Sequence, residues 1–241
     1  MIKRLVGRAL RPFGINLFPR RFENPLMQEG IGDQELFDAI FETNYWKSEG
    51  TKSGFGSEEH FARSYRDRLD SLLRVRKLYH IFDAPCGDVS WMSVMVSNNS
   101  QFRYTGADIS PRLLASARQR FPDFDLRLLD ITKDSFPLAD VWHCRDCLFH
   151  LPFLSIKNAL INYVNSGIPY ALITSHRSRL FHRNLDVTTG GFRILDFELE
   201  PFSFDSPECR LQDYRIGFDF PRYVCLWPRR SIVRAIDKMH V

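Results

Sequence analysis

The sequence predicts an α/β protein, with helices on both faces of a seven-stranded and mostly parallel sheet. Short apolar runs alternate with helical segments between residues 78 and 176, which is the pattern of repeated strand–helix–strand units. Three of these runs end in an aspartate, at Asp83, Asp108 and Asp130, so three carboxylates are expected along one edge of the sheet. The 241 residues, 44% of them hydrophobic, are enough to bury one sizeable core.

Upstream of the alternating region, the sequence predicts a helical extension with two helices, over residues 35–46 and 58–78, joined by a glycine-rich link. Further along, a Ser-Pro pair at 110–111 favours a helix start, and Gly167 favours a helix end. The apolar runs predict strands over residues 78–84, 102–108, 124–130, 139–146 and 168–176. The segments between them predict helices over residues 91–97, 110–121 and 155–167.

Residues 177–211 interrupt this alternation. They are rich in turn residues and aromatic side chains, and they predict an insertion rather than another strand–helix unit. The last strong strand is expected over residues 222–228, paired with residues 213–218 as a terminal hairpin. The chain is therefore expected to consist of a basic arm (1–22), a helical lid or extension (23–76) and a main domain (77–241) that carries the insertion.

Positive charge is concentrated in the basic arm. Its 22 residues carry six basic side chains and no acid, which leaves the rest of the chain with a net charge of −2 out of a total of +4. A nucleic-acid partner is therefore not expected. Apolar residues from Ile2 to Phe13 follow helical spacing, which Pro12 interrupts. Such a segment favours peripheral contact with an anionic membrane surface, and packing on the domain or on a partner is the alternative.

Cysteine usage and the absence of a secretory pattern predict a cytoplasmic protein, with the basic arm as a candidate anchor at the inner membrane face. Five cysteines, an odd number, give no disulfide framework, and no apolar run reaches the roughly 18 residues that a membrane span needs. Cys144 and Cys147 form an isolated CxxC without a second cysteine pair or a nearby histidine pair, so no zinc site is expected.

The stretch "IFDAPCGDVSWM" (81–92) indicates which ligand the sheet edge would bind. Its turn contains a single glycine, Gly87, and Asp108 follows 21 residues later, close to the interval at which the acid of a second strand meets a ribose. Asp88 directly after the glycine disfavours a phosphate, because a helix N-terminus holds anions through its free amides. The turn suits a ligand with a ribose but no phosphate, and S-adenosylmethionine is such a ligand.

These segments together resemble the class I, Rossmann-like methyltransferases that depend on S-adenosylmethionine. The stretches "IFDAPCGD", "YTGADIS", "LRLLDIT" and "ADVWHCRDCLFHLP" are similar to the first four motifs of that family. The chain further resembles a bacterial group with "DxPCGDxxWM" and "CRDxLxHL" motifs, an upstream Trp46 with "SGFGS", a "TGGFR" segment and a late "LW". The likeness spans residues 41–228, and some members of the group lie beside surface-glycan genes.

The resemblance implies a set of cofactor contacts along the three strand ends. Around the methionine part it places Asp83, Cys86, Gly87 and Asp88. Around the nucleoside it places Asp108 on both ribose hydroxyls, Ile109 against the adenine, Asp130 on the adenine amine and the backbone NH of Ile131 on the ring. The Pro85-Cys86 pair departs from the commoner Gly-x-Gly approach and makes this turn stiffer.

Two further residues are expected near the cofactor on chemical grounds. The small residues of "SGFGS" (53–57) would let the backbone close over the cofactor as a lid, with Trp46 as an aromatic cover; a plain flexible connector is the alternative. Arg145 is expected to hold the cofactor carboxylate or an acidic substrate, and an ordinary ion pair is its alternative.

Candidate catalytic residues follow the fourth and fifth strands. Asp146 and His150 are spaced i, i+4 and could face one cleft, with either as general base or with Asp146 orienting His150; a helix cap is the alternative for Asp146. His176 is a second base candidate, with a surface-loop histidine as its alternative, and Arg193 beside a Gly-Gly turn is a candidate substrate contact. His143 is expected to be a core histidine, and a metal held by the three residues 143, 146 and 150 is disfavoured because they lie on alternate faces.

The resulting function hypothesis is an S-adenosylmethionine-dependent methyltransferase. The expected reaction is O-methylation of a sugar hydroxyl in a bacterial surface glycan or its lipid-linked precursor, a substrate that rests on the basic arm and on analogy. Methylation of a small metabolite or of a protein side chain is the enzymatic alternative. A cofactor-binding partner without activity is the alternative of a different class.

Overall fold

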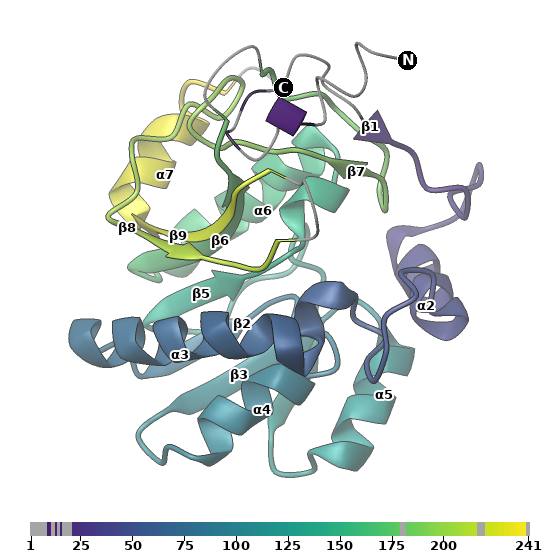
Figure 1. The fold of residues 1–241 in the computed structure, drawn as a ribbon, viewed down its shortest axis with the longest axis vertical. Coiled ribbons are helices and arrows are strands. Elements are labelled where there is room, and N and C mark those ends of the chain that lie inside the picture. The colour runs from purple at the N-terminus through teal and green to yellow at the C-terminus, as the bar shows by residue number, and fades with distance from the viewer. Residues whose placement is uncertain are drawn as a thin grey trace.

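The computed structural model describes residues 9–10, 13, 15, 21–178, 182–215 and 220–239. A seven-stranded sheet lies at its centre, in the order β4-β3-β2-β5-β6-β9-β8 (Figure 1). Neighbouring strands are parallel from β4 to β6, and β9 is antiparallel to both β6 and β8. The strands are β2 (His80–Asp83), β3 (Arg103–Asp108), β4 (Asp125–Leu128), β5 (Val141–Cys144), β6 (Tyr170–His176), β8 (Cys209–Gln212) and β9 (Arg222–Pro228). The predicted α/β fold with a mostly parallel sheet is confirmed.

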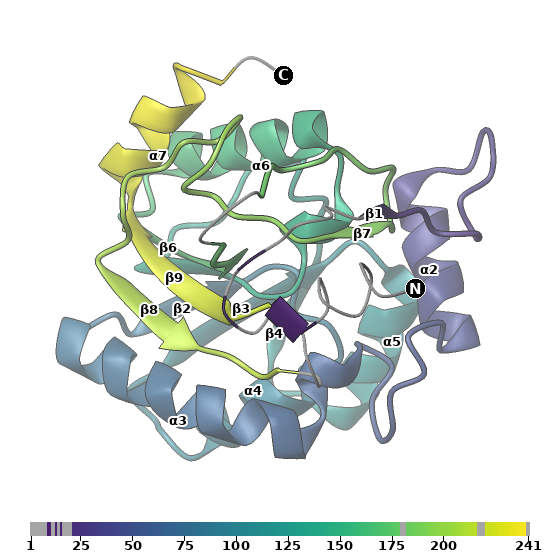
Figure 2. The same ribbon diagram turned by 45° about the horizontal axis from the view of Figure 1, so that its top comes forward.

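Helices cover both faces of the sheet, because successive side chains of its strands point to opposite sides. Ile81 packs into one apolar core with α3 (Glu59–Arg76), α4 (Ser90–Ser97) and α5 (Pro111–Arg120). The next residue, Phe82, packs into a second core with α6 (Phe153–Ser166), α7 (Arg229–Ile236) and the aromatic part of the 177–211 insertion. Figure 2 shows these two groups of helices on either side of the strands. Every helix predicted between strands is present, within a few residues of the expected bounds.

The helical extension has a different packing on each side of its link. Helix α3 lies on the sheet against α4, and α2 (Asp33–Thr43) packs against α5. The Asp38 carboxylate accepts a hydrogen bond from the Ser110 hydroxyl at the start of α5, and Glu42 pairs with Arg112 one turn later. Between the two helices, the link contains a short 3-10 helix, η2 (Phe55–Ser57). The predicted helices of the extension are therefore present.

A second, two-stranded sheet joins the beginning of the chain to the insertion. Strand β1 (Arg21–Phe22) pairs antiparallel with β7 (Phe192–Arg193), so Arg21 lies opposite Arg193 and Phe22 opposite Phe192. Figure 1 shows β1 and β7 side by side, above α2. The "TGGFR" segment of the sequence therefore lies next to residues that precede α2.

The predicted terminal hairpin is wrong in one of its strands. Strand β9 forms as expected, but its partner is β8, at residues 209–212, rather than residues 213–218. Leu211 is buried opposite Val224, whereas the backbone NH of Asp213, just after β8, donates to the carbonyl oxygen of Arg222 and its carboxylate pairs with Arg145. The pairing of β9 therefore follows the burial of Leu211 and of a charged pair rather than local β propensity; residues 216–218 of the predicted strand lie outside the described residues.

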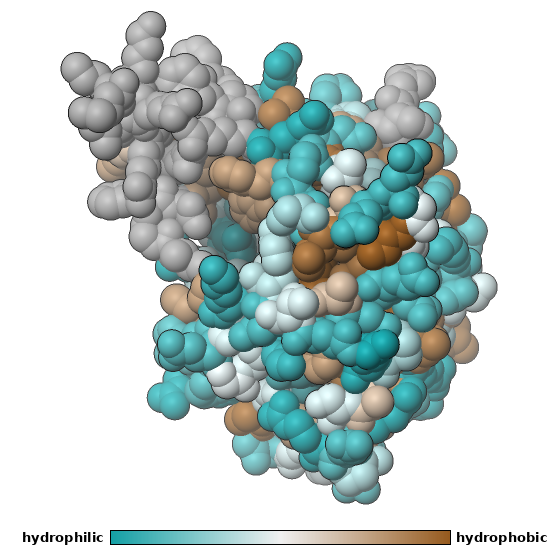
Figure 3. Space-filling model, turned by 90° about the vertical axis from the view of Figure 1, so that its right-hand side faces the viewer, coloured by the Kyte–Doolittle hydropathy of each residue, from teal (hydrophilic) through white to brown (hydrophobic). Residues whose placement is uncertain are grey.

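The basic arm lies almost wholly outside the described residues, and so does its predicted helix. No helix in the described part of the chain is long and apolar enough to cross a membrane. On the side of the molecule shown in Figure 3, the described surface is mainly hydrophilic, and apolar side chains gather in one larger area.

Candidate functional site

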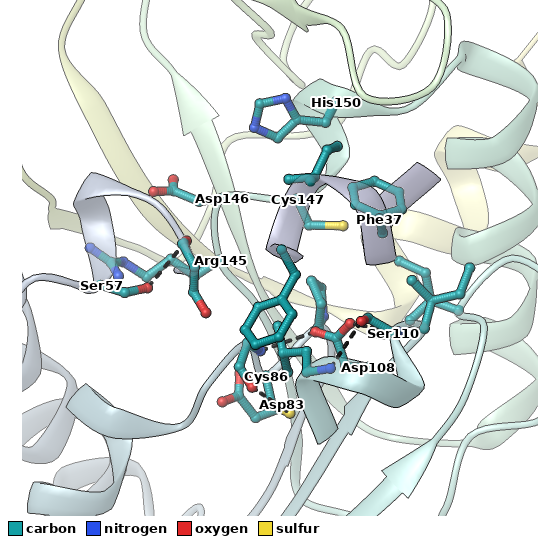
Figure 4. Close-up of a pocket in the computed structure, with 18 of the residues that line it drawn as sticks. Phe37, Ser57, Asp83, Cys86, Asp108, Ser110, Arg145, Asp146, Cys147 and His150 are labelled. Atoms are coloured by element: carbon teal, nitrogen blue, oxygen red, sulfur yellow. Dashed lines mark hydrogen bonds between the residues drawn. The ribbon is translucent and has the colours of Figure 1, made fainter. Parts of the chain in front are cut away.

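A pocket opens at the carboxyl ends of β2, β3 and β5 and beside the segment that follows β4. Its empty space is about 1080 Å³, part of which is open to solvent. Carboxylates and backbone turns from the sheet form its floor (Figure 4). Phe37 and Phe41 of α2, together with Trp46, form an aromatic wall, and Ser53 and Ser57 of the link complete the cover. This is the edge at which open α/β sheets bind their ligands.

The turn after β2 approaches the link closely. Gly87 has φ +57°, and its backbone NH donates to Asp108 Oδ2 at 3.1 Å. The NH of Asp88 donates to Ser53 Oγ at 2.8 Å, and a Cβ added at Gly87 would lie 2.8 Å from that same oxygen. A glycine is therefore required here both by the left-handed backbone and by the approach of the link. The segment predicted as a lid is docked directly on the first motif.

The carboxylates after β3 and β4 both face the pocket. Asp108 accepts one backbone hydrogen bond on each oxygen, from Gly87 and from Ser110 at 3.0 Å. Burial raises the pKa of Asp108 to about 6, although those hydrogen bonds oppose the shift. Asp130 pairs with Lys133 at 2.8 Å and accepts from Thr132, and these contacts outweigh burial and lower its pKa. The other predicted nucleoside and turn contacts also line the pocket: Cys86, Ile109, Ile131 and Trp46.

Asp83 lines the pocket floor but is held in a buried network. Its Oδ1 lies 2.6 Å from His143 Nδ1, and its Oδ2 accepts from the Tyr104 hydroxyl at 2.7 Å. The other ring nitrogen of His143, Nε2, lies 2.8 Å from the Tyr65 hydroxyl. His143 lies directly opposite Asp83 on the neighbouring strand and is fully buried, so the predicted core histidine is confirmed. The Asp83 carboxylate is therefore fixed at the floor of the pocket by hydrogen bonds with His143 and Tyr104.

His150 is held in one tautomer. Its Nδ1 lies 2.5 Å from the carbonyl oxygen of Gly191, and because a carbonyl can only accept, Nδ1 carries the proton. Burial lowers the pKa of His150 to about 4, against the opposing effects of the Gly191 hydrogen bond and the Asp146 charge. The ring is therefore neutral near pH 7, and its Nε2 carries a lone pair. The Trp46 ring lies 5.5 Å from it between centroids.

Asp146 follows β5 and faces the same pocket as His150 (Figure 4). Its backbone is left-handed, with φ +55°, and its NH donates to Thr174 Oγ1 at 2.9 Å. The carboxylate accepts from the Tyr214 hydroxyl at 2.8 Å and from Arg222 at 3.2 Å. Burial alone would raise the pKa of Asp146, but the charges of Arg222 and Arg145 outweigh it and lower the pKa. Asp146 is therefore an ionised carboxylate, better suited to orient or to stabilise charge than to accept a proton.

Two of the predicted cofactor contacts have other partners. The Arg145 guanidinium makes two 2.8 Å hydrogen bonds to Asp213 and a third, at 2.9 Å, to the carbonyl of Gly56. It lines the pocket, but its charge is already paired, so the ion-pair alternative holds. Asp88 is not among the residues that line the pocket: its carboxylate accepts from the NH of Ser90 at the start of α4 and lies 3.5 Å from Arg120. Only its backbone NH faces the link.

Two of the predicted catalytic and substrate residues lie away from the pocket. His176 is 1% exposed, and its Nδ1 lies 3.2–3.3 Å from the backbone nitrogen and carbonyl oxygen of Leu195, so it supports the insertion instead. Arg193 is completely buried, with its guanidinium 5.0 Å above the Phe153 ring. Burial lowers the pKa of Arg193 to about 10. Both assignments to the site are therefore corrected.

Several residues of the site carry no signal that the sequence analysis could use. Tyr214 and Arg222 lie 68 and 76 positions beyond Asp146 in sequence, yet they fix its carboxylate. Phe37 and Phe41 look like ordinary core positions of an amphipathic helix, and the spacing of "SGFGS" gives no indication that Ser53 would bond to the first motif. Gly56 belongs to the small-residue segment that the sequence singled out, and the structure gives the reason for a glycine there: a Cβ would lie 2.5 Å from Asp146 Oδ2.

Comparison with known proteins places the chain by its fold. No protein-family model and no curated protein sequence matches it. Among solved structures, it is similar to the N-methyltransferase NodS from Bradyrhizobium japonicum, with 17% identity, a TM-score of 0.56 and coverage of 79% of this chain and 98% of that one. It is also similar to the magnesium protoporphyrin IX methyltransferase from Synechocystis (12% identity, TM-score 0.55, 84% and 100% covered).

A third similar structure is the methyltransferase domain of a bacterial Hen1 protein, with 15% identity, a TM-score of 0.54 and coverage of 70% of this chain and 99% of that domain. The NodS structure is a complex with S-adenosylhomocysteine, and the Synechocystis structure has bound S-adenosylmethionine. The chain therefore has the Rossmann-like fold of the class I S-adenosylmethionine-dependent methyltransferases.

Proposed function

We propose that the protein is an S-adenosylmethionine-dependent O-methyltransferase with His150 as its general base. The observation that carries the proposal is the tautomer of His150, whose Nδ1 is bound to Gly191 and whose neutral Nε2 belongs to a side chain lining the same pocket as Asp108. A neutral imidazole with a fixed proton on the far nitrogen is the form that can accept a proton from an alcohol.

The charges of the pocket fit the cofactor. Among the described residues that line it, five are aspartates and two, Lys52 and Arg145, are cations. Such a lining disfavours a ligand with phosphates and favours a nucleoside that carries positive charge. Asp108 uses one lone pair of each oxygen within the protein and keeps others for the two ribose hydroxyls. Asp130 and Ile131 line the side where the adenine would lie.

The chemistry divides between the bound cofactor and the side chains around it. When bound, S-adenosylmethionine supplies a methyl carbon activated by a positive sulfonium. His150 accepts the proton of the acceptor hydroxyl at Nε2, and the nearby ionised Asp146 stabilises the imidazolium that forms. Trp46 and the aromatic wall keep water from the reacting groups.

The proposed acceptor is a sugar hydroxyl in a bacterial surface glycan or its lipid-linked precursor. The "CRDCLFHL" and "TGGFR" segments resemble a bacterial group of which some members lie beside surface-glycan genes, and the basic start of the chain is similar to that of glycan-modifying methyltransferases; both likenesses support this assignment. The six positive charges of the basic arm support action at an anionic membrane face, where a lipid-linked acceptor would lie.

Variants of His150 and Asp146 test the catalytic assignment. In a coupled assay of S-adenosylhomocysteine release with candidate glycans, His150→Gln is expected to lower kcat by about 100-fold or more, because general-base catalysis is worth about that much. Its affinity for S-adenosylhomocysteine should stay close to that of the wild type. Retention of near wild-type turnover by both His150→Gln and Asp146→Asn would show that the assignment is wrong. Cofactor binding without turnover on any acceptor would favour a non-catalytic partner.

Liposome flotation tests the membrane part of the proposal. The full chain should float with vesicles containing anionic lipid, and a variant with Lys3, Arg4, Arg8 and Arg11 changed to Gln should float less. Equal flotation of both proteins would contradict the anchor.

A further inference from the structure

The residues that follow the basic arm pack against the turn that holds His150. Asn24, 4% exposed, donates from Nδ2 to the carbonyl oxygen of Gly190 at 3.2 Å, and its Oδ1 accepts from the NH of Leu26 at 2.9 Å. The NH of Gly190 in turn donates to the carbonyl oxygen of His150 at 2.8 Å. The turn is therefore bonded on one side to the catalytic segment and on the other to Asn24.

A second set of contacts fixes the entry to the same turn. The Glu23 carboxylate accepts from both the NH of Thr188, at 3.0 Å, and its hydroxyl, at 2.5 Å. Burial would raise the pKa of Glu23, but the hydrogen bonds from Thr188 and the charge of Arg21 outweigh it and lower the pKa, so the carboxylate is ionised and acts as an acceptor. Arg21 reaches further and donates to the carbonyl oxygen of Asp186 at 3.0 Å.

The two glycines of the turn are required by this packing. A Cβ added at Gly190 would lie 2.9 Å from Asn24 Nδ2, and Gly190 also has φ +77°. A Cβ added at Gly191 would lie 2.8 Å from the carbonyl oxygen of Phe22. The segment 22–24 therefore lies in direct contact with both residues, and one of them, Gly191, supplies the carbonyl oxygen that accepts the hydrogen bond from His150 Nδ1–H.

We propose that Glu23 and Asn24 are positioning residues for His150, which act by holding the Gly190–Gly191 turn so that the Gly191 carbonyl keeps the proton on Nδ1. The pairing of β1 with β7 adds a backbone constraint on the same turn, since Phe22 lies opposite Phe192. Loss of these contacts would let the carbonyl move and would allow the second neutral tautomer, in which Nε2 carries the proton and cannot act as a base. The catalytic consequence rests on the proposed function, whereas the effect on the tautomer does not.

The test compares Asn24→Asp with the wild type of the full chain. This change keeps the Oδ1 acceptor for Leu26 but replaces the donor to Gly190 by an oxygen, so it removes one contact of the turn. Asn99→Asp is the matched control: Asn99 is 8% exposed, accepts from the NH of Gln101 in the same way, and has no partner for its Nδ2 among the described residues. Thr188→Val is the second test variant, and it replaces Asn24→Asp if that protein does not fold. It removes the hydrogen bond from the Thr188 hydroxyl to the Glu23 carboxylate at an exposed site.

The readout is the pair of ¹⁵N imidazole chemical shifts of His150, assigned by their loss in His150→Gln. The wild type and Asn99→Asp should show only the Nδ1–H tautomer near pH 7, and Asn24→Asp and Thr188→Val should show a mixture, with unchanged affinity for S-adenosylhomocysteine. A single unchanged tautomer in both test variants would overturn the proposal. A wild type that binds neither S-adenosylmethionine nor S-adenosylhomocysteine would refute the proposed function. The ¹⁵N shifts of His150 would still show whether Glu23 and Asn24 fix its tautomer.

Discussion

At the scale of single residues, burial shifts two ionisable groups of the site in opposite directions. Asp108 and His150 both lose contact with water, which disfavours their charged forms, so the pKa of the acid rises to about 6 and that of the base falls to about 4. Asp146 escapes this rule because the charges of Arg222 and Arg145 keep it ionised. The site therefore combines a neutral imidazole with an ionised carboxylate near pH 7.

The raised pKa of Asp108 gives cofactor binding a pH dependence. On the proposed assignment, the ionised carboxylate would accept from both ribose hydroxyls and the protonated form could not, so affinity should be constant above about pH 6. Below that pH it should fall by about tenfold per pH unit, because the ionised fraction falls by that factor. Calorimetric titration of S-adenosylmethionine between pH 5 and 7.5 measures this. Asp108→Asn should bind more weakly and without this dependence; an equally steep fall in the variant would assign the effect to another group.

At the scale of secondary-structure elements, the sequence predicted what local patterns determine. Strands β2 and β3 end at Asp83 and Asp108, and Asp130 follows two residues after β4. These positions and the helices between them depend on apolar spacing and on caps such as Ser110, which accepts from the NH of Leu113. The partner of β9 was predicted wrongly because strand pairing depends on which side chains, such as Leu211, are buried by residues far away in sequence. His176 and Arg193 were misplaced for the same reason, and the partner of Arg145 could not be named: partners such as Leu195 and Asp213 depend on the folded structure and leave no local pattern.

The close approach of the link between α2 and α3 to Asp146 and Tyr214 depends on Gly56. Gly56→Ala would bring a methyl group within 2.5 Å of Asp146 Oδ2 and 2.7 Å of Tyr214 Cε1. Overpacking of this kind costs about 1–3 kcal/mol, so we expect affinity for S-adenosylmethionine to fall by about 10- to 100-fold. Gly32→Ala is the control, because its added methyl group meets open space. Equal affinities of the two variants in calorimetry would show that the link does not close the site.

At the scale of the whole molecule, Arg145 joins three distant parts of the chain. Its guanidinium binds Asp213 after β8 and the carbonyl of Gly56 in the link, and lies 4.8 Å from the Tyr65 ring of α3. The pair with Asp213 is almost completely buried, so each charge depends on the other. The link, the sheet and the segment after β8 are therefore joined at the edge of the pocket.

Removal of one partner should therefore destabilise the whole fold. Asp213→Asn leaves the Arg145 charge buried without a counter-ion, and the free energy of unfolding should fall by about 3–5 kcal/mol, measured by urea denaturation. Asp205→Asn, which removes the exposed partner of Arg234, should change it by at most about 0.5 kcal/mol. A loss for Asp213→Asn no larger than that of the control would contradict the coupling.

The central claim is that this pocket binds a positively charged nucleoside without phosphates and uses it as a methyl donor. Isothermal titration calorimetry of the wild-type chain with S-adenosylmethionine, with NAD and ATP as comparison ligands, tests it most directly. Saturable binding of S-adenosylmethionine with one site per chain, reduced by Asp108→Asn, is the predicted result. No binding of S-adenosylmethionine, together with saturation by NAD or ATP, would contradict it.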